Sequence, residues 1–464
     1  MRRRDALKTL GALAGTAYAS KFLSACGDSS GGRIDTLVFM MMENRSYDHY
    51  LGSRSLVEGL PGDGLLASMS NPDGNGQEVP VYVTPSSDVE QCVANDPPHG
   101  WDDSRIQFGG GANNGFIRAH EGHHGVGAVE PMAYMLRDQV PVTHALADSY
   151  TSCDRWFGSI LGPTLPNRMY WHAGTSNGAT TNDEVLDGAF DGVRTIHHQL
   201  EDAKVDWAYY FGDVPVIAVI EDIEKDGKLK RFYNDFLTDA AAGTLPSVCY
   251  IDPAFSGNDD HPPHHPLLGQ QLIAATYQAL ASSPQWENCL LVITYDENGG
   301  FYDHVAPPTV PDERASAGFD QLGFRVPTLV IGPYAKQGHV SSVQYDHTSA
   351  IKHLANQFGL PPLTMRSDIA NDLSDCIDFE RLEAGEPAPP ITLPTVEIDE
   401  NELPASCSGA SFRTAEYEHD ILRWADEQPA KFRQWDARAD TRDAIYGIAD
   451  YLDHHNIGRI KRQR

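Results

Sequence analysis

Five short apolar runs, separated by segments of helical periodicity, carry the architecture that this sequence predicts. The first, from Ile34 to Met42, is almost unbroken, which is typical of a strand buried on both faces. Helical patterns lie between the runs, as at residues 268–281 and 347–358. Strands that alternate with helices predict an α/β fold, a three-layer sandwich around a mostly parallel central sheet. The other four runs cover residues 205–211, 247–251, 289–295 and 326–331.

Residues 52–150 break this pattern with sequence rich in glycine, proline, asparagine and histidine. We expect long loops here, inserted between strands so that they wall an active site instead of forming a domain. Residues 387–404 form a connector rich in proline and glutamate, and residues 412–453 predict a pair of polar helices. The predicted organisation is a catalytic domain at 27–386 and a C-terminal segment at 387–464 that packs on its core.

The first 26 residues predict an export signal instead of a folded element. Arg3 and Arg4 resemble a twin-arginine signal and precede an apolar stretch too short to remain as a membrane span. The stretch ends at Cys26 in a sequence that resembles a bacterial lipobox, so we expect acylation of Cys26 and anchoring in the cell envelope. The alternatives are secretion behind an ordinary signal with a chance cysteine and, because Ala6 departs from the twin-arginine pattern, export by the Sec route.

Composition narrows the classes of partner and substrate. With 41% hydrophobic residues among 464, the chain has material for a large core, so disorder is not expected. A formal net charge of −30 repels phosphate backbones and excludes nucleic acid as an expected partner. An anionic substrate therefore needs a local positive site, which a metal ion can supply.

Six cysteines remain besides Cys26. An even number in an oxidising compartment permits up to three disulfides, with free buried thiols as the alternative. These cysteines are Cys92, Cys153, Cys249, Cys289, Cys376 and Cys407.

Candidate chemistry follows the apolar runs, because functional groups in open α/β sheets collect beyond the carboxyl ends of the strands. Glu43 and Asn44 follow the first run, and Asp296 and Glu297 follow the run at 289–295. Between them, a Gly/Pro turn opens a helical segment at Thr164. Carboxylate and amide oxygens of this kind suit a hard or borderline divalent cation.

At these positions the sequence resembles the bacterial phosphoesterase family of non-specific phospholipases C and acid phosphatases, relatives of the alkaline phosphatases. Five blocks match in family order over about residues 34–360. The resemblance implies an alkaline-phosphatase-like fold and a metal-dependent hydrolase of phosphoric esters. The blocks are ENRSYDHYLG from Glu43, DPPHGWDD from Asp96, GPTLPNR from Gly162, DDHPP from Asp259 and TYDENGGFYDHVAPP from Thr294.

The resemblance makes Glu43, Asn44, Asp296, Glu297 and Thr164 ligands of one divalent metal ion. Calcium, magnesium or manganese suits these oxygen ligands, and zinc is an alternative. Without a metal, Asn44 would be a helix N-cap and the acidic pair a solvated loop.

Thr164 is the predicted nucleophile. It precedes a helix, where backbone N–H groups and the helix dipole favour the charge of an alkoxide or a bound phosphate. Its hydroxyl needs activation by the cation. The family has threonine here in its phospholipases C and serine in its acid phosphatases, so Thr164 favours a phospholipase C. The alternative is a simple N-cap between two prolines.

The family motifs also select histidines. His99 and His261 match positions that bind the phosphoryl group, together with Asn44, and serve proton transfer. His304 matches a further motif and is a third catalytic candidate. Asn298 departs from the family, which commonly has histidine there.

Other histidines are weaker candidates. His197 and His198 follow one another, and His198 in particular is a candidate for a further substrate contact. His261, His264 and His265 form an alternative zinc site.

The predicted reaction is cleavage of phospholipids to diacylglycerol and a phosphorylated head group through a phosphothreonine intermediate. An acid phosphatase acting on soluble phosphomonoesters is one alternative, and an inert lipid-anchored binding protein is another. We expect apolar residues of the insertion to meet acyl chains, with packing of the site wall as the alternative. These residues are Trp101, Phe108, Phe116 and Met132.

Overall fold

A computed structural model of the chain describes residues 31–86, 96–220, 223, 225–400, 420–427 and 443–461. The predicted export signal, the acylation site Cys26, and Cys92 and Cys407 lie outside these residues.

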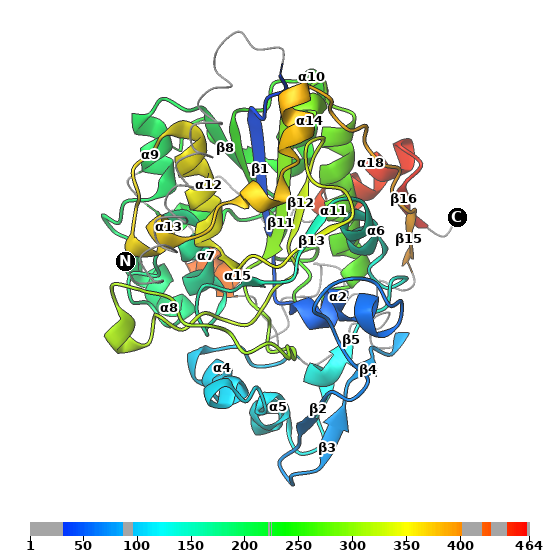
Figure 1. Cartoon of the computed structure of the whole chain (residues 1–464), viewed down its shortest axis with the longest axis vertical. Coiled ribbons are helices and arrows are strands. Elements are labelled where there is room, and N and C mark those ends of the chain that lie inside the picture. Colours follow the sequence, from blue (N-terminus) through cyan, green and yellow to red (C-terminus); the bar gives the residue numbers. More distant parts are fainter. Residues whose placement is uncertain are drawn as a thin grey trace, which may run out of the picture.

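An eight-stranded sheet forms the centre of the molecule (Figure 1). All neighbouring strands pair in parallel except β12, which is antiparallel to both β11 and β6. The mostly parallel sheet is confirmed, and each of the five predicted runs contains a strand. The order is β13 (His339–Ser341), β6 (Thr151–Cys153), β12 (Leu329–Ile331), β11 (Cys289–Tyr295), β1 (Thr36–Met42), β10 (Val248–Asp252), β8 (Trp207–Phe211) and β9 (Leu229–Arg231).

Helices cover both faces of the sheet, so the predicted three-layer sandwich is confirmed (Figure 1). One layer contains α7 (Thr164–Ala173), α8 (Asn182–Glu184), α9 (Ile196–Asp202), α12 (Thr348–Phe358) and α13 (Met365–Ile369). The opposite layer contains α6 (Pro141–Ser149), α10 (Leu237–Ala242), α11 (Pro266–Ala281) and α18 (Ile448–His454). The two predicted helical segments correspond to α11 and α12.

The prediction of loops throughout residues 52–150 is wrong in part. Below the carboxyl end of β1 in Figure 1, this insertion forms its own small layer of helices and short strands. Phe116 and Ile117 are fully buried in a separate apolar cluster, which the high glycine content concealed. The elements are α2 (Tyr47–Leu56), α4 (Trp101–Phe108), α5 (Phe116–His124), β2 (Ser70–Pro72), β3 (Glu78–Pro80), β4 (Tyr82–Val83) and β5 (Ala133–Tyr134).

The pairing of β1 with β11 fixes the position of the chemistry. The two strands run in register from Thr36 opposite Cys289 to Met42 opposite Tyr295. The backbone N–H of Asp296 then donates to the carbonyl of Met42 (3.2 Å). The residues that follow the two strands therefore leave the sheet side by side at one edge.

The four described cysteines are free and buried. The Sγ atoms of Cys153 and Cys376 lie 3.9 Å apart without a bond between them. For these four cysteines the predicted disulfides are therefore absent, and the alternative of free buried thiols holds.

The described parts of the C-terminal segment fold back onto the body. β15 (Val396–Asp399) pairs in parallel with β16 (Gly458–Lys461), and α18 packs against α11. Ile448 and Leu452 of α18 enter the main apolar core. α14 (Phe379–Ala384) precedes this segment, and α15 (Asp420–Glu427) is a further helix within it. Among the residues described, no helix combines the length and apolar character needed to cross a bilayer.

We predict that Leu452→Ala lowers the free energy of unfolding by about 2–5 kcal/mol, because it opens a cavity at a fully buried position. Urea unfolding measures the effect. Leu66→Ala is the matched control, since Leu66 is 58% exposed. Equal midpoints for the two variants would mean that the C-terminal segment is not part of the cooperative core.

Candidate active site

Three buried carboxylates gather where β1 and β11 end. Glu43, Asp296 and Glu297 are at most 2% exposed. The backbone N–H of Asn44 donates to Asp296 Oδ1 (3.1 Å), which ties the two strand ends together. The strand ends predicted from sequence thus meet, and the solvated-loop alternative for Asp296 and Glu297 is wrong because both are buried.

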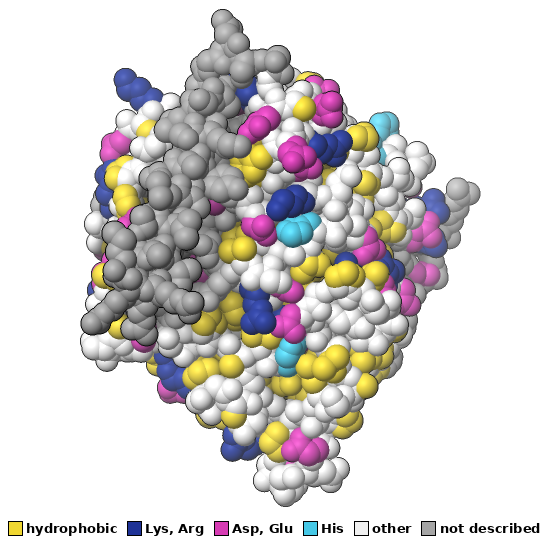
Figure 2. Space-filling model, in the orientation of Figure 1, with side chains coloured by type: hydrophobic (Ala, Val, Ile, Leu, Met, Phe, Trp, Pro, Cys, Tyr) yellow, Lys and Arg dark blue, Asp and Glu magenta, His cyan; other side chains and the backbone are white. Residues whose placement is uncertain are grey.

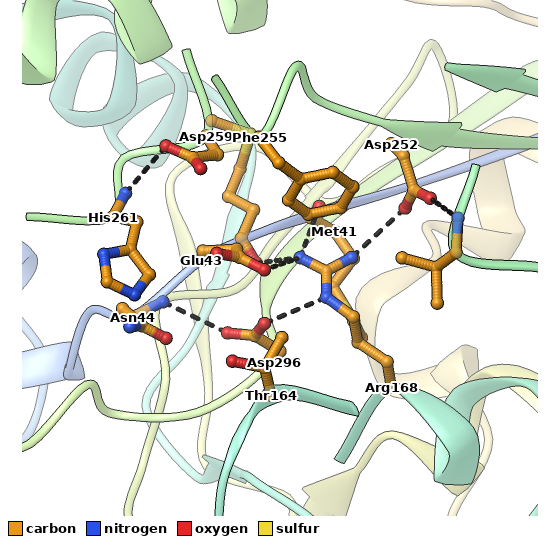
Figure 3. Close-up of polar contacts among 12 residues, drawn as sticks. Met41, Glu43, Asn44, Thr164, Arg168, Asp252, Phe255, Asp259, His261 and Asp296 are labelled. Atoms are coloured by element: carbon orange, nitrogen blue, oxygen red, sulfur yellow. Dashed lines mark hydrogen bonds and ion pairs between the residues drawn. The ribbon is translucent and has the colours of Figure 1, made fainter. Parts of the chain in front are cut away.

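Arg168 of α7 lies in the middle of these acids (Figure 3). Its guanidinium contacts Asp296 Oδ2 (2.9 Å), Asp252 Oδ1 (3.1 Å) and Glu43 Oε1 (3.3 Å), and its side chain is 2% exposed. The sequence analysis gave Arg168 no role. The available signal was a lone arginine two residues after a proline at the start of a helix.

One arginine does not balance four buried acids. Burial raises the pKa of Asp252 to about 6, although Arg168 opposes the shift. Burial and the neighbouring charge of Asp296 raise the pKa of Glu297 well above its usual range. The site therefore favours an added positive charge.

Asn44 adopts an unusual backbone conformation. Its φ is +59°, in the left-handed region that asparagine tolerates better than most residues. The N-cap of α2 is Ser46, whose side chain accepts from the N–H of His49 (3.0 Å), so the N-cap alternative for Asn44 is wrong. Gly299 packs so closely that a Cβ there would lie 2.3 Å from the carbonyl oxygen of Asn44.

Thr164 is the first residue of α7, and Pro163 is its N-cap. The Thr164 hydroxyl caps no backbone group and instead donates to Glu297 Oε1 (3.1 Å). The N-cap alternative for Thr164 is therefore wrong. A hydroxyl that donates to a buried carboxylate at a helix N-terminus is placed to lose its proton and to bear negative charge.

The donor set fits a divalent cation. Within the described part of the chain, Asn44 Oδ1 and Glu297 Oε2 are buried without a hydrogen-bond partner. They are hard oxygen ligands beside an excess of carboxylates. The acids are spread around Arg168, so a bound cation would compete with this arginine for Glu43 and Asp296.

His99 and His261 complete the group. His99 Nε2 lies 3.3 Å from Asn44 Nδ2 and 3.9 Å from Glu297 Oε1. The two imidazole rings lie 5.8 Å apart. The structure thus places His99 beside Asn44 and Glu297, with the ring of His261 next to it, and the catalytic roles of both histidines stay predictions.

Three other predicted histidines make structural contacts. Both ring nitrogens of His304 hydrogen-bond to acids, Nδ1 to Asp48 (2.7 Å) and Nε2 to Asp63 (3.1 Å). The hydrogen bonds of the His304 ring go to these two acids and not to Thr164 or the acidic group around Arg168, so its catalytic role stays a prediction. His198 accepts from Thr195 within the capping box of α9. His197 is buried against His172 (3.2 Å).

The alternative zinc site at His261, His264 and His265 is not assembled. His264 Nδ1 hydrogen-bonds to Asp259, and His265 caps α11 by accepting from the N–H of Leu267 (3.2 Å). Among the described residues, one group of three side chains has its possible metal-ligand atoms within 4.8 Å of one another. This group is Asp96, His99 and His261.

Comparison with known proteins identifies the family. The model of the Phosphoesterase family matches residues 34–361. Non-specific phospholipase C6 of Arabidopsis thaliana is 34% identical over 400 residues, which cover 78% of this chain and 75% of that protein. Phospholipase C A of Mycobacterium tuberculosis is 31% identical over 406 residues, which cover 75% of this chain and 77% of that protein. The chain belongs to the phosphoesterase family.

The resemblance recognised in the sequence is thereby confirmed, and this phosphoesterase is a hydrolase of phosphoric esters. The crystal structure of an alkaline phosphatase superfamily protein from Vibrio parahaemolyticus aligns with 74% of the phosphoesterase and 71% of that chain, with 11% identity and a TM-score of 0.39.

The apolar residues expected to meet acyl chains are mostly internal. Phe116 and Met132 are buried in the cluster of the insertion, and Phe108 packs against it. Trp101 packs on Phe319, with ring centroids 5.0 Å apart. The prediction that Phe116 and Met132 contact acyl chains is therefore wrong, because both side chains are buried. These two residues instead pack inside the protein, as the alternative of wall packing expected.

We predict that Glu297→Gln lowers kcat by roughly 10²–10³-fold, because it removes the acceptor of the Thr164 proton and one anionic ligand. The fold should be at least as stable as wild type, since the substitution keeps the shape of the side chain and removes an acid whose ionisation burial opposes. Kinetics with an aryl phosphate and thermal melting measure both effects. Normal turnover would exclude Glu297 from the reaction.

We predict that His304 stabilises the fold only below alkaline pH. Burial opposes protonation, but the hydrogen bond and charge of Asp48 raise the pKa of His304 to about 9. The charged form therefore contributes fully below pH ~6.5, by at most roughly 3 kcal/mol, and this is lost as the pH rises through 9. The difference in unfolding free energy between wild type and His304→Asn should shrink over that range. A constant difference would contradict the charged pairing.

Proposed function

We propose that this phosphoesterase is a phospholipase C that cleaves a phospholipid to diacylglycerol and a phosphorylated head group. The observation that carries the proposal is the hydrogen bond from Thr164 to Glu297 inside the buried acidic group. The named phospholipases C among its relatives support the substrate class. We further propose one divalent cation held by Glu43, Asn44, Asp296, Glu297 and Thr164.

A cation at these residues would lower the pKa of the Thr164 hydroxyl and offset negative charge on the phosphoryl group. Electrostatic help of this kind is needed, because accelerations of phosphate-ester hydrolysis reach ~10²¹. Positioning accounts for only about 7–11 kcal/mol of such a barrier. Most of the remainder must come from preorganised charge.

The proposed reaction has two displacements. Thr164 Oγ1 attacks phosphorus, its proton passes to Glu297 Oε1, and the bond from phosphorus to the glycerol oxygen breaks. The leaving oxygen takes a proton with histidine assistance, from His99 or His261, and departs as diacylglycerol. Water then attacks the phosphothreonine and gives a proton to the histidine that lost one in the first step. The bond from phosphorus to Oγ1 breaks, Glu297 returns its proton to Oγ1, and the phosphorylated head group leaves.

A lipid substrate is favoured over a soluble monoester by the surface of the insertion. Leu66, Ile106 and Val126 are 58%, 46% and 80% exposed. Figure 2 shows apolar side chains gathered on the lower part of the visible face, where the insertion lies. Exposed apolar groups on the insertion that also carries His99 are suited to contact with a lipid surface. An acid phosphatase remains the second candidate, since the catalytic residues would be shared.

We also propose export and lipid anchoring through Cys26, supported by the arginine pair and the lipobox-like sequence. The inert binding protein considered above fits poorly, because every residue of the proposed reaction is present and Thr164 already contacts Glu297.

We predict that Thr164→Ala lowers turnover by roughly 10³-fold or more on every substrate, because it removes the attacking oxygen. The unacylated protein is assayed on phosphatidylcholine, p-nitrophenyl phosphorylcholine and p-nitrophenyl phosphate. Thr238→Ala is the control, since Thr238 is exposed on α10.

Release of diacylglycerol by wild type but not by Thr164→Ala supports both the substrate and the nucleophile. Cleavage of the monoester alone would retain the mechanism and move the enzyme to the acid phosphatases. Equal rates for wild type and Thr164→Ala would remove Thr164 as the nucleophile.

A further inference from the structure

Two side chains of α4 hold the main chain that carries His99. His99 lies just before this helix in the sequence. Ser104 Oγ donates to the carbonyl of His99 (3.1 Å), and Gln107 Nε2 donates to the carbonyl of Pro98 (2.6 Å). The place of the His99 imidazole in the site therefore depends on where α4 lies.

Arg105 reaches from α4 to the turn that carries the proposed nucleophile. Its Nη1 donates to the carbonyl of Trp101 (2.9 Å) in the same helix and to the carbonyl of Leu161 (2.8 Å). Leu161 stands three residues before Thr164. The guanidinium carbon lies over the Trp101 ring, 3.2 Å from its centroid. The same ring packs on Gly162, where a Cβ would lie 3.5 Å from Trp101 Cε3.

The bond from Arg105 joins parts of the site that are otherwise anchored separately. On its inner side, the turn is held by Asn167 of α7, whose Nδ2 donates to the carbonyl of Gly162 (2.8 Å). Asn167 belongs to the same helix as Thr164, so it does not connect the turn to His99. Within the described residues, the hydrogen bond from Arg105 to Leu161 is the one between α4 and this turn.

The guanidinium of Arg105 is suited to a connecting role. Among the residues described, no carboxylate forms an ion pair with it. Partial burial lowers the pKa of Arg105 to about 10, with Asp102 opposing the shift, so the side chain is charged at neutral pH. A charged donor makes stronger hydrogen bonds than a neutral one, and a planar guanidinium can donate while it lies over an aromatic ring.

We propose that Arg105 is a positioning residue that sets His99 against Thr164 by tying α4 to the nucleophile turn. The proposal rests on the proposed function, in which Thr164 attacks phosphorus and a histidine protonates the leaving oxygen. Both groups must meet the same phosphoryl group, and a misplacement of about 1 Å costs roughly 10²-fold in rate. Arg105 would act through this geometry and not by contact with the substrate.

The experiment compares wild type with Arg105→Ala and Arg105→Lys on p-nitrophenyl phosphorylcholine, with kcat and KM determined separately. We expect Arg105→Ala to lower kcat by roughly 10–100-fold with little change in KM. Arg105→Lys should recover only part of the loss, because an ammonium lacks the planar fork. Added guanidinium ion, far below denaturing concentrations, should restore part of kcat in Arg105→Ala and leave wild type unchanged.

Arg118→Ala is the matched control, since Arg118 is an exposed arginine on α5 of the same insertion. It should keep the kcat and melting temperature of wild type. The position of His99 is read without substrate from the imidazole resonances of ¹⁵N-labelled protein, with His99→Gln giving the assignment. These resonances should shift in Arg105→Ala and stay in place in Arg118→Ala.

A wild-type kcat and unshifted His99 resonances in Arg105→Ala would overturn the proposal. A loss of activity that only follows a larger unfolded fraction would also overturn it, since Arg105 would then serve stability alone. Failure of the proposed function has a different signature, which is equal turnover by wild type and Thr164→Ala. In that case the His99 resonances still decide whether Arg105 positions this histidine.

Discussion

The buried guanidinium of Arg168 is the interaction on which the rest of the site depends. It holds Glu43, Asp252 and Asp296 at one point inside the protein, where unpaired carboxylates would be strongly destabilising. The single positive charge of Arg168 stabilises these buried carboxylates but does not neutralise all of them. The remaining negative charge favours the divalent cation proposed at this site, in a protein whose overall charge repels anionic substrates.

The central sheet determines where these charged side chains lie. Because β1 and β11 are parallel and in register, their carboxyl ends place Glu43 and Asp296 side by side. Asn44 turns in the left-handed conformation directly after β1, and Gly299 of the segment that follows β11 packs closely against it. α7 brings Thr164 and Arg168 to the same edge, one turn apart, so the helix that begins with the proposed nucleophile also carries the balancing charge.

Local sequence was sufficient for five of the eight strands of the sheet and for the acids that follow β1 and β11, but it missed β6, β9 and β13. Ile34 to Met42 reads as a doubly buried strand, and Glu43 follows it, so the position of the carboxylate comes from periodicity alone. The role of Arg168 could not be read in this way, since its partner Asp252 is 84 residues away. Likewise, His304 matches a motif, but its ring is held by Asp48 from 256 residues away. Short-range patterns also missed α4 and α5, whose few apolar residues pack partly against distant residues such as Tyr302 and Phe324.

The two sides of the site belong to different parts of the fold, the acids to the central sheet and His99 to the insertion. Glu43, Asp296 and Glu297 are fixed to the sheet, which the large core keeps rigid. His99 instead belongs to the insertion, together with the exposed Leu66 and Val126. A lipid surface in contact with these apolar residues would act on the same insertion that carries His99. The 3.9 Å between His99 Nε2 and Glu297 Oε1 is therefore a contact between the insertion and the carboxyl end of the sheet.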